Sequence, residues 1–460
     1  MPTETLRIRH PAFAIRGYPP PMSANPQQAM PPQAAAADAP TPDTDPAGLA
    51  ARYGRVRARS VALAAPLSPE DAMVQSMEDA SPAKWHLAHT TWFFERFVLG
   101  ARDGYVPVDA QWDFLFNSYY QSVGPMHARP SRGLVSRPSL GQVLDYRAEV
   151  DARIARRVDA GDIDRDDARV LLLGTHHEQQ HQELLLTDIK HAFFCNPMAP
   201  AYRDDLPASR GAATPLRWIA RDEAIAGIGA PAWPNDHAFA FDSESPRHRV
   251  LVPAHALASR PVTNAEYAAF VDDGGYADPA LWMSEGWALL QSEGTCRPLY
   301  WHADGEREFT LAGWRARDPH APACHLSYHE ADAFARWAGA RLPTEAEWEQ
   351  AATGMAVDGH FADADGALHP RPARGDETGL VQMFGDVWEW TSSAYGSYPG
   401  FRTLPGALGE YNGKFMCGQW ILRGGSCATP RDHVRASYRN FFPPPARWQF
   451  SGLRLARDPA

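Results

Sequence analysis

The sequence changes character at Asn196-Pro197, and this change constrains the fold more than any other feature. Before it, residues 48–195 show the apolar spacing of long amphipathic helices. After it, residues 205–460 show short strand-like runs separated by proline, glycine and tryptophan. With 460 residues, the chain is long enough for two or three domains of ordinary size. We therefore expect an α+β protein with a helical bundle over 48–200 and a mixed domain over 201–460.

The N-terminal part differs from both halves. Residues 19–47 are rich in proline and alanine, a composition that buries too little apolar surface to offset the entropy of ordering. We expect a disordered tail over 1–47. It lacks the apolar core of a secretory signal, and the chain has no run of about 18 apolar residues that would cross a membrane.

Charge and cysteine content exclude several classes of protein. The formal net charge of -11 disfavours a nucleic-acid binder, because phosphate neutralisation needs a basic surface. The five cysteines are widely spaced and form no CxxC pair, which disfavours a disulfide framework or a zinc ribbon. We expect a reducing, cytoplasmic location and no membrane partner.

Four helices are expected in the first half. Two begin at Ser68-Pro69 and Ser81-Pro82, and two cover residues 139–158 and 164–194. Four amphipathic helices of this kind predict an antiparallel bundle. The irregular stretch 103–137 is long for a compact domain, and such loops are usually functional. In the second half, helices are expected near 263–272 and 327–338.

Histidines recur with helical spacing on two of these helices. His177 and His181 are four residues apart, so both imidazoles lie on one face, as two ligands of one metal require. His86 and His89 on the second helix offer a third ligand. Histidine pairs also arise by chance, but two such helices in one bundle favour a metal site. Three imidazoles can hold zinc, copper or iron, and the spacing leaves that choice open.

Two neighbouring residues do not fit this face. His176 has no histidine four residues later, because that position is Gln180. Glu183 lies six residues after His177 and off its face, so we expect it to support the ligands rather than bind the metal.

Several motifs together resemble one enzyme family. KWHLAHTTWFFE (84–95) and HEQQHQE (177–183) resemble the DinB-like iron-binding bundle of the sulfoxide synthases of ergothioneine biosynthesis, the EgtB type. The second half resembles the formylglycine-generating-enzyme-like, or sulfatase-modifying-factor, domain, which has a C-type-lectin-like α+β fold. Its motifs are RPVTNAEYAAFVDDGGY (260–276), RLPTEAEWEQAA (341–352), GDVWEWTSS (385–393), LRGGS (422–426) and SYRNFF…RWQFSGLRLA (437–456). That domain alone does not specify an activity, and its pairing with the bundle points to the sulfoxide synthases.

The resemblance implies a non-heme iron(II) enzyme. It would use O2 to join hercynine (trimethylhistidine) to cysteine through a C–S bond, giving hercynylcysteine sulfoxide. The implied iron ligands are His89, His177 and His181. FNSYYQSVGP (116–125) is similar to a subgroup in which a tyrosine pair lies beside the iron, so Tyr119 and Tyr120 become the catalytic candidates. A phenol, with a reference pKa of about 10, is a suitable proton donor at neutral pH.

The resemblance also implies substrate contacts. Gln180 matches a glutamine that binds the histidine-derived substrate, and Arg129 and Arg132 match arginines that hold the carboxylate of the thiol substrate. A guanidinium can grip a carboxylate with two parallel bonds. The RN-aromatic position that lines the pocket from the second domain is occupied here by Asn440, Phe441 and Phe442. Taken alone, the arginines are also compatible with solvated loop charges, and the tyrosines and phenylalanines with packing.

Two departures from the resembling families refine the expectation. The mycobacterial-type enzymes have Trp-Asp after the asparagine, whereas this chain has Phe441-Phe442. The missing acid favours free cysteine over γ-glutamylcysteine. The formylglycine-generating enzymes need a reactive cysteine pair near the C-terminus, and the spacing of Cys417 and Cys427 does not match it.

Other functions stay open at this point. A related synthase would use histidine, γ-glutamylcysteine or a selenium donor. A noncatalytic lectin-like binding protein and a DinB-type zinc thiol transferase are the alternatives from other classes. In every enzymatic case the partners are small molecules, and the sequence does not predict an oligomeric state.

Overall fold

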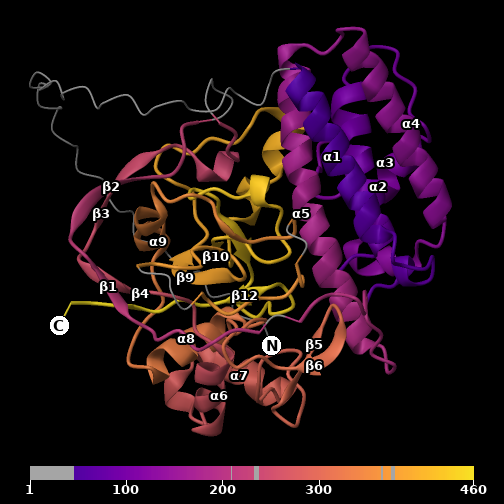
Figure 1. Cartoon of the computed structure of the whole chain (residues 1–460). Coiled ribbons are helices and arrows are strands. Elements are labelled where there is room, and N and C mark those ends of the chain that lie inside the picture. Colours follow the sequence, from indigo (N-terminus) through magenta and orange to yellow (C-terminus); the bar gives the residue numbers. More distant parts are fainter. Residues whose placement is uncertain (1–45, 209, 233–237, 364–365, 375–378, 460) are drawn as a thin grey trace, which may run out of the picture. The chain divides into compact units, whose positions relative to one another are not determined.

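The helical half of the chain folds around four long helices. The computed structural model describes residues 46–208, 210–232, 238–363, 366–374 and 379–459. The expected tail over 1–47 lies outside these residues, except for Pro46 and Ala47 at the start of α1. The long helices are α1 (Pro46–Ala64), α2 (Ala83–Phe94), α4 (Leu140–Asp159) and α5 (Arg165–Cys195), as Figure 1 shows.

Capping residues explain where two of these helices begin. The Ser139 hydroxyl accepts a hydrogen bond from the Gln142 amide at the start of α4. The Asp164 carboxylate accepts from the amides of Asp166 and Asp167 at the start of α5. The helices expected over 139–158 and 164–194 are thus confirmed within about two residues. The helix expected after Ser81-Pro82 is α2.

The prediction of a helix that begins at Ser68-Pro69 is wrong. Only a 3-10 turn forms, over Asp71–Met73, although the Ser68 hydroxyl does accept the Asp71 amide. The polar residues that follow supply no apolar stripe to bury, so the cap has no helix to extend. The fourth long helix is instead α1, which buries a row of residues with helical spacing: Leu49, Tyr53, Val56 and Leu63.

The stretch between α2 and α4 is irregular, as expected. It contains a π-helical turn (Glu95–Leu99), the short helix α3 (Trp112–Phe116) and a 3-10 helix (Arg129–Leu134). Its buried residues include Phe116, Asn117, Ser118, Tyr120 and Arg132. The loop is therefore packed into the protein rather than extended over its surface.

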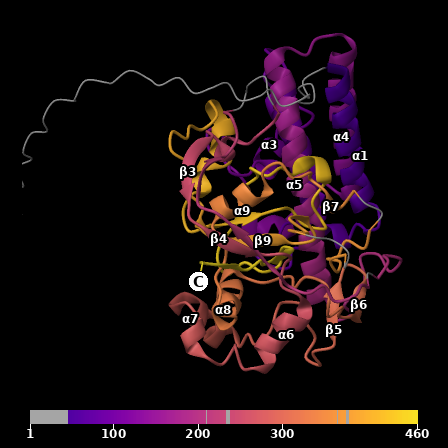
Figure 2. The same ribbon diagram turned by 60° about the vertical axis from the view of Figure 1, so that its left-hand side comes forward.

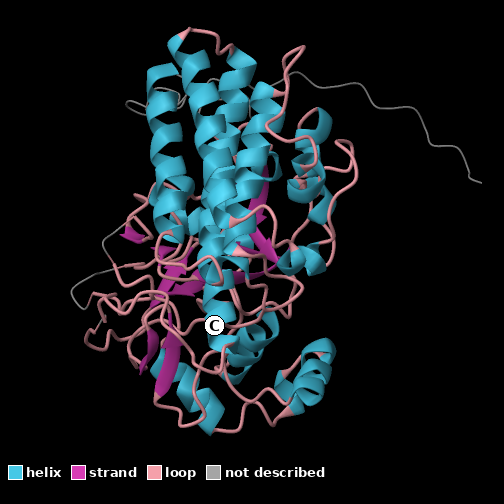
Figure 3. Cartoon of the chain, turned by 90° about the vertical axis from the view of Figure 1, so that its right-hand side faces the viewer, coloured by secondary structure: helices cyan, strands magenta, loops and turns pink. Residues whose placement is uncertain are grey.

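The second half is a mixed α+β structure with short strands (Figure 3). Helices α6 (Asn264–Asp272) and α8 (Tyr328–Trp337) confirm the two expected ones, while α7 (Ser284–Glu293) and α9 (Glu345–Ala352) were not expected. The strands are β1 (Trp218–Arg221), β2 (Ala224–Ile228), β3 (His248–Val252), β4 (His255–Ala258), β5 (Arg307–Thr310), β6 (Gly313–Ala316), β7 (Gly359–His360), β8 (Phe384–Gly385), β9 (Trp388–Ala394), β10 (Trp420–Arg423), β11 (Asn440–Phe442), β12 (Ser451–Gly452) and β13 (Ala456–Arg457).

The largest sheet has the strand order β11-β10-β9-β12. Strands β9, β10 and β11 pair antiparallel, and β12 pairs parallel with β9. A second sheet has the order β1-β4-β13, and β2-β3, β5-β6 and β7-β8 form two-stranded pairs.

Helix α5 connects the two halves. Figures 1 and 2 show it alongside the strands of the second half. Its Glu183 carboxylate accepts hydrogen bonds from Trp388, Ser426 and Thr429, at 2.8, 2.6 and 2.7 Å. Further along, Lys190 Nζ lies 2.6 Å from His325 Nε2. These buried polar bonds fix the register between α5 and the second half.

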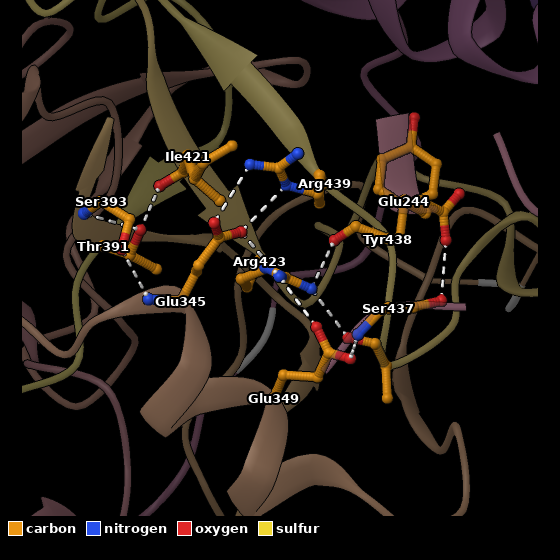
Figure 4. Close-up of polar contacts among 12 residues, drawn as sticks. Glu244, Glu345, Glu349, Thr391, Ser393, Ile421, Arg423, Ser437, Tyr438 and Arg439 are labelled. Carbon is orange, nitrogen blue, oxygen red and sulfur yellow. Dashed lines mark hydrogen bonds and ion pairs between the residues drawn. The ribbon is translucent and has the colours of Figure 1, made fainter. Parts of the chain in front are cut away.

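Buried ion pairs support the segment that precedes β11 (Figure 4). Arg423 pairs with Glu345 at 2.8 Å and with Glu349 at 3.0 Å, and it donates to the carbonyl oxygens of Ala436 and Tyr438. Burial opposes the ionisation of Glu345, but Arg439 and Arg423 hold the pKa of this carboxyl below its ordinary value. The network thereby fixes the backbone at Tyr438.

None of the helices in the described part of the chain is both long and apolar enough to cross a membrane.

Candidate metal centre and substrate pocket

Three histidines from two helices meet at one buried point. His89 comes from α2, and His177 and His181 come from α5. One ring nitrogen of each lies within 4.8 Å of the others. The Nε2 atoms of His177 and His181 are 3.1 Å apart. The four-residue spacing on α5 and the packing of α2 against α5 create this cluster.

Hydrogen bonds outside the cluster orient two of the three rings. His89 Nδ1 lies 2.6 Å from the Phe116 carbonyl oxygen, so it carries the hydrogen and leaves Nε2 with a lone pair. His89 Nε2 is buried and has no hydrogen-bond partner in the described part of the chain. An orphaned buried nitrogen that faces two other imidazoles is the arrangement that a metal ion satisfies.

His181 is oriented through a second histidine. Its Nδ1 lies 2.8 Å from His86 Nδ1, and His86 Nε2 lies 3.1 Å from the Asp188 carboxylate. The carboxylate also accepts the Ser81 amide at 2.7 Å and the Trp448 indole at 3.2 Å. A chain from carboxylate to histidine to ligand fixes the ring and raises its basicity.

The three imidazoles are neutral. Burial lowers the pKa of His177 to about 3. Burial, followed by the neighbouring His177, lowers the pKa of His89 and of His181 well below the ordinary value. Neutral imidazole is the form that binds metal ions, so the electrostatics fit a three-histidine metal centre. Three protein ligands leave positions open for substrates.

Arg132 lies against the metal centre. Its guanidinium carbon is 3.3 Å from the centre of the Trp85 ring, and Trp85 stacks on His89 with ring centres 4.6 Å apart. The guanidinium donates to Ser81 Oγ at 3.0 Å and to Ser118 Oγ at 2.8 Å. Burial lowers its pKa to about 10, so it still carries its charge at neutral pH. The structure thus places a charged guanidinium near the histidines.

Arg129 is placed differently. Its guanidinium donates to the Asp79 carbonyl oxygen and lies 3.9 Å from the Asp79 carboxylate, with the side chain 40% exposed. The structure brings Arg132 to the histidines but leaves Arg129 at the surface.

The two candidate tyrosines have different environments. Tyr120 is 1% exposed and packs among Trp92, Phe93 and Phe97. It lines a small cavity with His177, and burial raises its pKa. Tyr119 is half-buried, lies close enough to Arg132 to favour its charged form, and has a φ of +71°. This left-handed conformation costs an aromatic residue about 1–3 kcal/mol and needs surrounding contacts to hold it.

Gln180 is held between two tyrosines of the second half. Its Nε2 donates to the Tyr438 hydroxyl at 2.7 Å, and the Tyr411 hydroxyl donates to its Oε1. The Tyr438 hydroxyl also lies 3.0 Å from His433 Nε2. The ring of Tyr411 lies 5.4 Å from that of His177. Tyr411 and Tyr438 were missed in the sequence because they lie in segments with no periodic pattern.

Asn440, Phe441 and Phe442 form strand β11 at the edge of the largest sheet. The Phe441 ring stacks on Tyr395, with ring centres 4.1 Å apart, and lies 5.9 Å from Phe415. The Phe442 ring lies 5.7 Å from Trp448. Phe415 in turn packs edge-on against Tyr119 at 5.1 Å. Phe441 therefore borders Tyr119 through the ring of Phe415.

Glu183 does not support the histidines. Its carboxylate binds Trp388, Ser426 and Thr429 in the second half, whereas the expected supporting role is taken by His86 and Asp188. The reason is its position six residues after His177, which turns it toward the second half.

Comparisons with known proteins agree with this two-part arrangement. Residues 52–185 match the DinB superfamily, and residues 228–459 match the sulfatase-modifying factor enzyme 1-like domain. A hercynine oxygenase of Mycolicibacterium thermoresistibile is 34% identical over 409 residues, covering 82% of this chain and 87% of that protein. A hercynine oxygenase of Mycobacterium tuberculosis is 33% identical over 443 residues, covering 90% and 100%. A formylglycine-generating enzyme of Mycobacterium tuberculosis is 32% identical over 222 residues, covering 36% of this chain and 71% of that protein.

Proposed function

We propose a specific reaction from the premise that the chain belongs to the hercynine oxygenase family. In this reaction hercynine, cysteine and O2 give hercynylcysteine sulfoxide and water. A C–H bond of the imidazole and the S–H bond of cysteine are replaced by one C–S bond. One oxygen atom enters the sulfoxide and the other leaves as water, so the four electrons needed to reduce O2 come from the two substrates.

The observation that carries this proposal is the cluster of three neutral, buried imidazoles next to Arg132. We propose that His89, His177 and His181 hold Fe(II). When bound, iron supplies O2 activation and lowers the pKa of a coordinated thiol. Two of the three rings are held in place by Phe116 and by His86 with Asp188, so these two donors are oriented before the metal arrives.

Arg132 and Gln180 are proposed to bind the two organic substrates. Arg132 would grip the carboxylate of the thiol substrate with paired hydrogen bonds, since its charge is buried and its plane is fixed against Trp85. Arg129 joins it in this proposal only if its side chain leaves Asp79. Gln180 would present its amide to the imidazole of hercynine, in an orientation that Tyr438 and Tyr411 fix.

The tyrosines and the edge strand complete the proposed pocket. Tyr119 or Tyr120 would donate a proton to oxygen during its reduction, because burial keeps the Tyr120 phenol protonated and Tyr119 lies near Arg132. Asn440, Phe441 and Phe442 would line the pocket, and the two aromatic faces suit a trimethylammonium group. No acid follows Asn440, so we propose free cysteine as the sulfur donor.

We also propose a division of the chain into a bundle over 48–200 and a second domain over 201–460. A cytoplasmic location is proposed because all five cysteines are unpaired.

The test is anaerobic reconstitution of the full chain with Fe(II), followed by substrates and air, with products identified by mass spectrometry. Parallel reactions use hercynine with cysteine, hercynine with γ-glutamylcysteine, and histidine with cysteine. The expected product is the sulfoxide of hercynine and cysteine. Sulfoxide from γ-glutamylcysteine alone would overturn the choice of donor, and product from histidine alone would overturn the choice of acceptor.

The same assay with a selenium donor in place of cysteine tests the alternative of C–Se bond formation. Binding of hercynine without any product in air would favour the noncatalytic lectin-like function. Activity that needs Zn(II) instead of Fe(II) and proceeds without O2 would favour a zinc thiol transferase.

A further inference from the structure

A segment of the second half covers the loop that carries Tyr119 and Tyr120. We call this loop the tyrosine loop. We call residues 404–415 the covering segment; it contains 3-10 turns over Gly406–Glu410 and Gly413–Phe415. The Asp242 carboxylate accepts the Leu404 amide at 3.3 Å and the Asn412 side chain at 2.7 Å. Two bonds to one buried carboxylate fix the covering segment on the second half.

The tyrosine loop needs such support at Tyr119. A φ of +71° places this residue in the left-handed region, which side chains other than glycine rarely adopt. The Gln121 amide donates to the Tyr119 carbonyl oxygen at 2.9 Å and closes a tight turn. Conformations of this kind persist only where neighbouring groups hold them.

Glu410 of the covering segment binds the backbone directly after Tyr119. Its Oε2 accepts the Gln121 amide and its Oε1 accepts the Ser122 amide, both at 2.9 Å. One carboxylate therefore holds two successive peptide units of the turn. Bonds from Lys414 and from Ser122 hold the pKa of Glu410 at about 2, so the acceptor is charged at every physiological pH.

Two more contacts hold the Tyr119 side chain. Phe415 packs edge-on against its ring, with centres 5.1 Å apart, and Arg132 lies close enough for the phenol to favour its charged form. The backbone is thus fixed by Glu410 and the ring by Phe415, while the neighbouring Arg132 lies on Trp85, which stacks on His89.

We propose that Glu410 is a positioning residue for the reaction. It fixes the turn after Tyr119 from the opposite half of the chain, so that the phenol stays near Arg132. The proposal rests on the proposed function, because it gives Tyr119 a role in the chemistry. It goes beyond that function because the conformation of the tyrosine loop in the first half then depends on the Glu410 carboxylate of the second half.

The test compares Glu410→Gln with the control Lys414→Gln in the iron-loaded full chain. The glutamine keeps the size of the side chain but can accept only one of the two amides. Lys414→Gln removes the salt-bridge partner and leaves both amide bonds in place. Both variants are also made in a Tyr119→Phe background, to separate an effect through Tyr119 from a general one.

For Glu410→Gln we expect about tenfold lower kcat for sulfoxide formation, with the KM values of hercynine and cysteine unchanged. Lys414→Gln is expected to keep the wild-type kcat. In the Tyr119→Phe background, Glu410→Gln should lower kcat no further. An equal loss of kcat in both backgrounds, or an unchanged kcat, would overturn the proposal.

Amide hydrogen exchange of the peptide that contains Gln121 and Ser122 gives a readout independent of activity. Exchange should accelerate at least about tenfold in Glu410→Gln and stay unchanged in Lys414→Gln. Unchanged exchange in both variants would overturn the proposal. If the wild-type chain forms no sulfoxide, the proposed function has failed, and exchange still decides whether Glu410 holds the turn.

Discussion

The Arg132 guanidinium carbon lies 3.3 Å from the centre of the Trp85 ring, and that same indole stacks on His89. A buried guanidinium and one imidazole of the three-histidine cluster are therefore connected through a single aromatic side chain. Trp85 is itself fixed, because its indole N–H donates to the Leu115 carbonyl oxygen at 3.2 Å. The geometry of the guanidinium is thus tied to that of the three-histidine cluster.

Replacement of Arg132 by lysine should weaken binding of the thiol substrate. Lysine has no planar fork to bond Ser81 and Ser118 together while lying flat on Trp85. We expect the KM for cysteine to rise about tenfold or more, with iron content unchanged. Steady-state kinetics at saturating hercynine measure this. An unchanged KM in Arg132→Lys would show that Arg132 does not bind the thiol substrate. Arg129→Lys, at the surface, is the control.

Alanine at His89, His177 or His181 should abolish metal binding. Each variant leaves only two imidazoles, so we expect less than about a tenth of the Fe(II) that the wild-type chain binds. Metal analysis after anaerobic loading and desalting measures it. The matched control is His176→Gln, because His176 lies beside His177 in sequence but stacks on Phe239 instead. Stoichiometric iron in any of the three alanine variants would show that the ligand is misassigned.

Asparagine at Asp188 should weaken metal binding without removing it. The change removes the carboxylate from the series of hydrogen bonds that runs from Asp188 through His86 to His181. We expect a rise of about 10- to 100-fold in the dissociation constant for Fe(II), measured by competition with a chelator. Glu183→Gln is the control, since it changes another buried carboxylate of α5 that binds only the second half. An equal effect of both changes would contradict an orienting role for Asp188.

Phenylalanine at Tyr119 or Tyr120 should separate iron binding from chemistry. Each variant keeps the aromatic ring that packs against Phe415 or against Trp92 and Phe97. Loss of the proton donor should lower sulfoxide formation by about 10²-fold or more in at least one variant, with iron retained. Wild-type sulfoxide yield in both variants would exclude the pair from the mechanism.

His360 should make the fold less stable in acid. Its ring is 3% exposed, and burial, followed by the nearby Arg371, lowers its pKa to about 4. The unfolded histidine binds a proton near pH 6.5 and the folded one only near pH 4, so stability is lost as the pH falls between these values. We expect the free energy of unfolding to decrease by up to about 3 kcal/mol from this residue. Denaturant unfolding of the wild-type chain and His360→Gln at pH 7 and pH 4.5 checks this. Identical pH dependence of the two proteins would contradict it.

Some features were predictable because they depend on local sequence. The caps at Ser139 and Asp164 define α4 and α5, and the spacing of His177 and His181 follows from helical periodicity. The two-part α+β organisation follows from the change in pattern near Asn196. A cap alone was insufficient at Ser68, where no apolar stripe follows.

Other features depend on contacts between distant segments. Spacing alone offered both His86 and His89 as the third ligand. In the structure His89 bonds the Phe116 carbonyl oxygen, whereas His86 lies between Asp188 and His181. Tyr411 lies near His177 only because Asp242 fixes the covering segment. No local pattern marks such residues, and the surface position of Arg129 depends in the same way on Asp79.

The most direct measurement is the fate of oxygen in a single product. The iron-loaded chain is mixed anaerobically with hercynine and cysteine, exposed to oxygen-18 gas, and the product is analysed by mass spectrometry. The proposed reaction predicts hercynylcysteine sulfoxide that carries one oxygen-18 atom, and unlabelled sulfoxide when the label is in the water instead. Absence of a C–S product, or a product without oxygen from the gas, would contradict the proposed function.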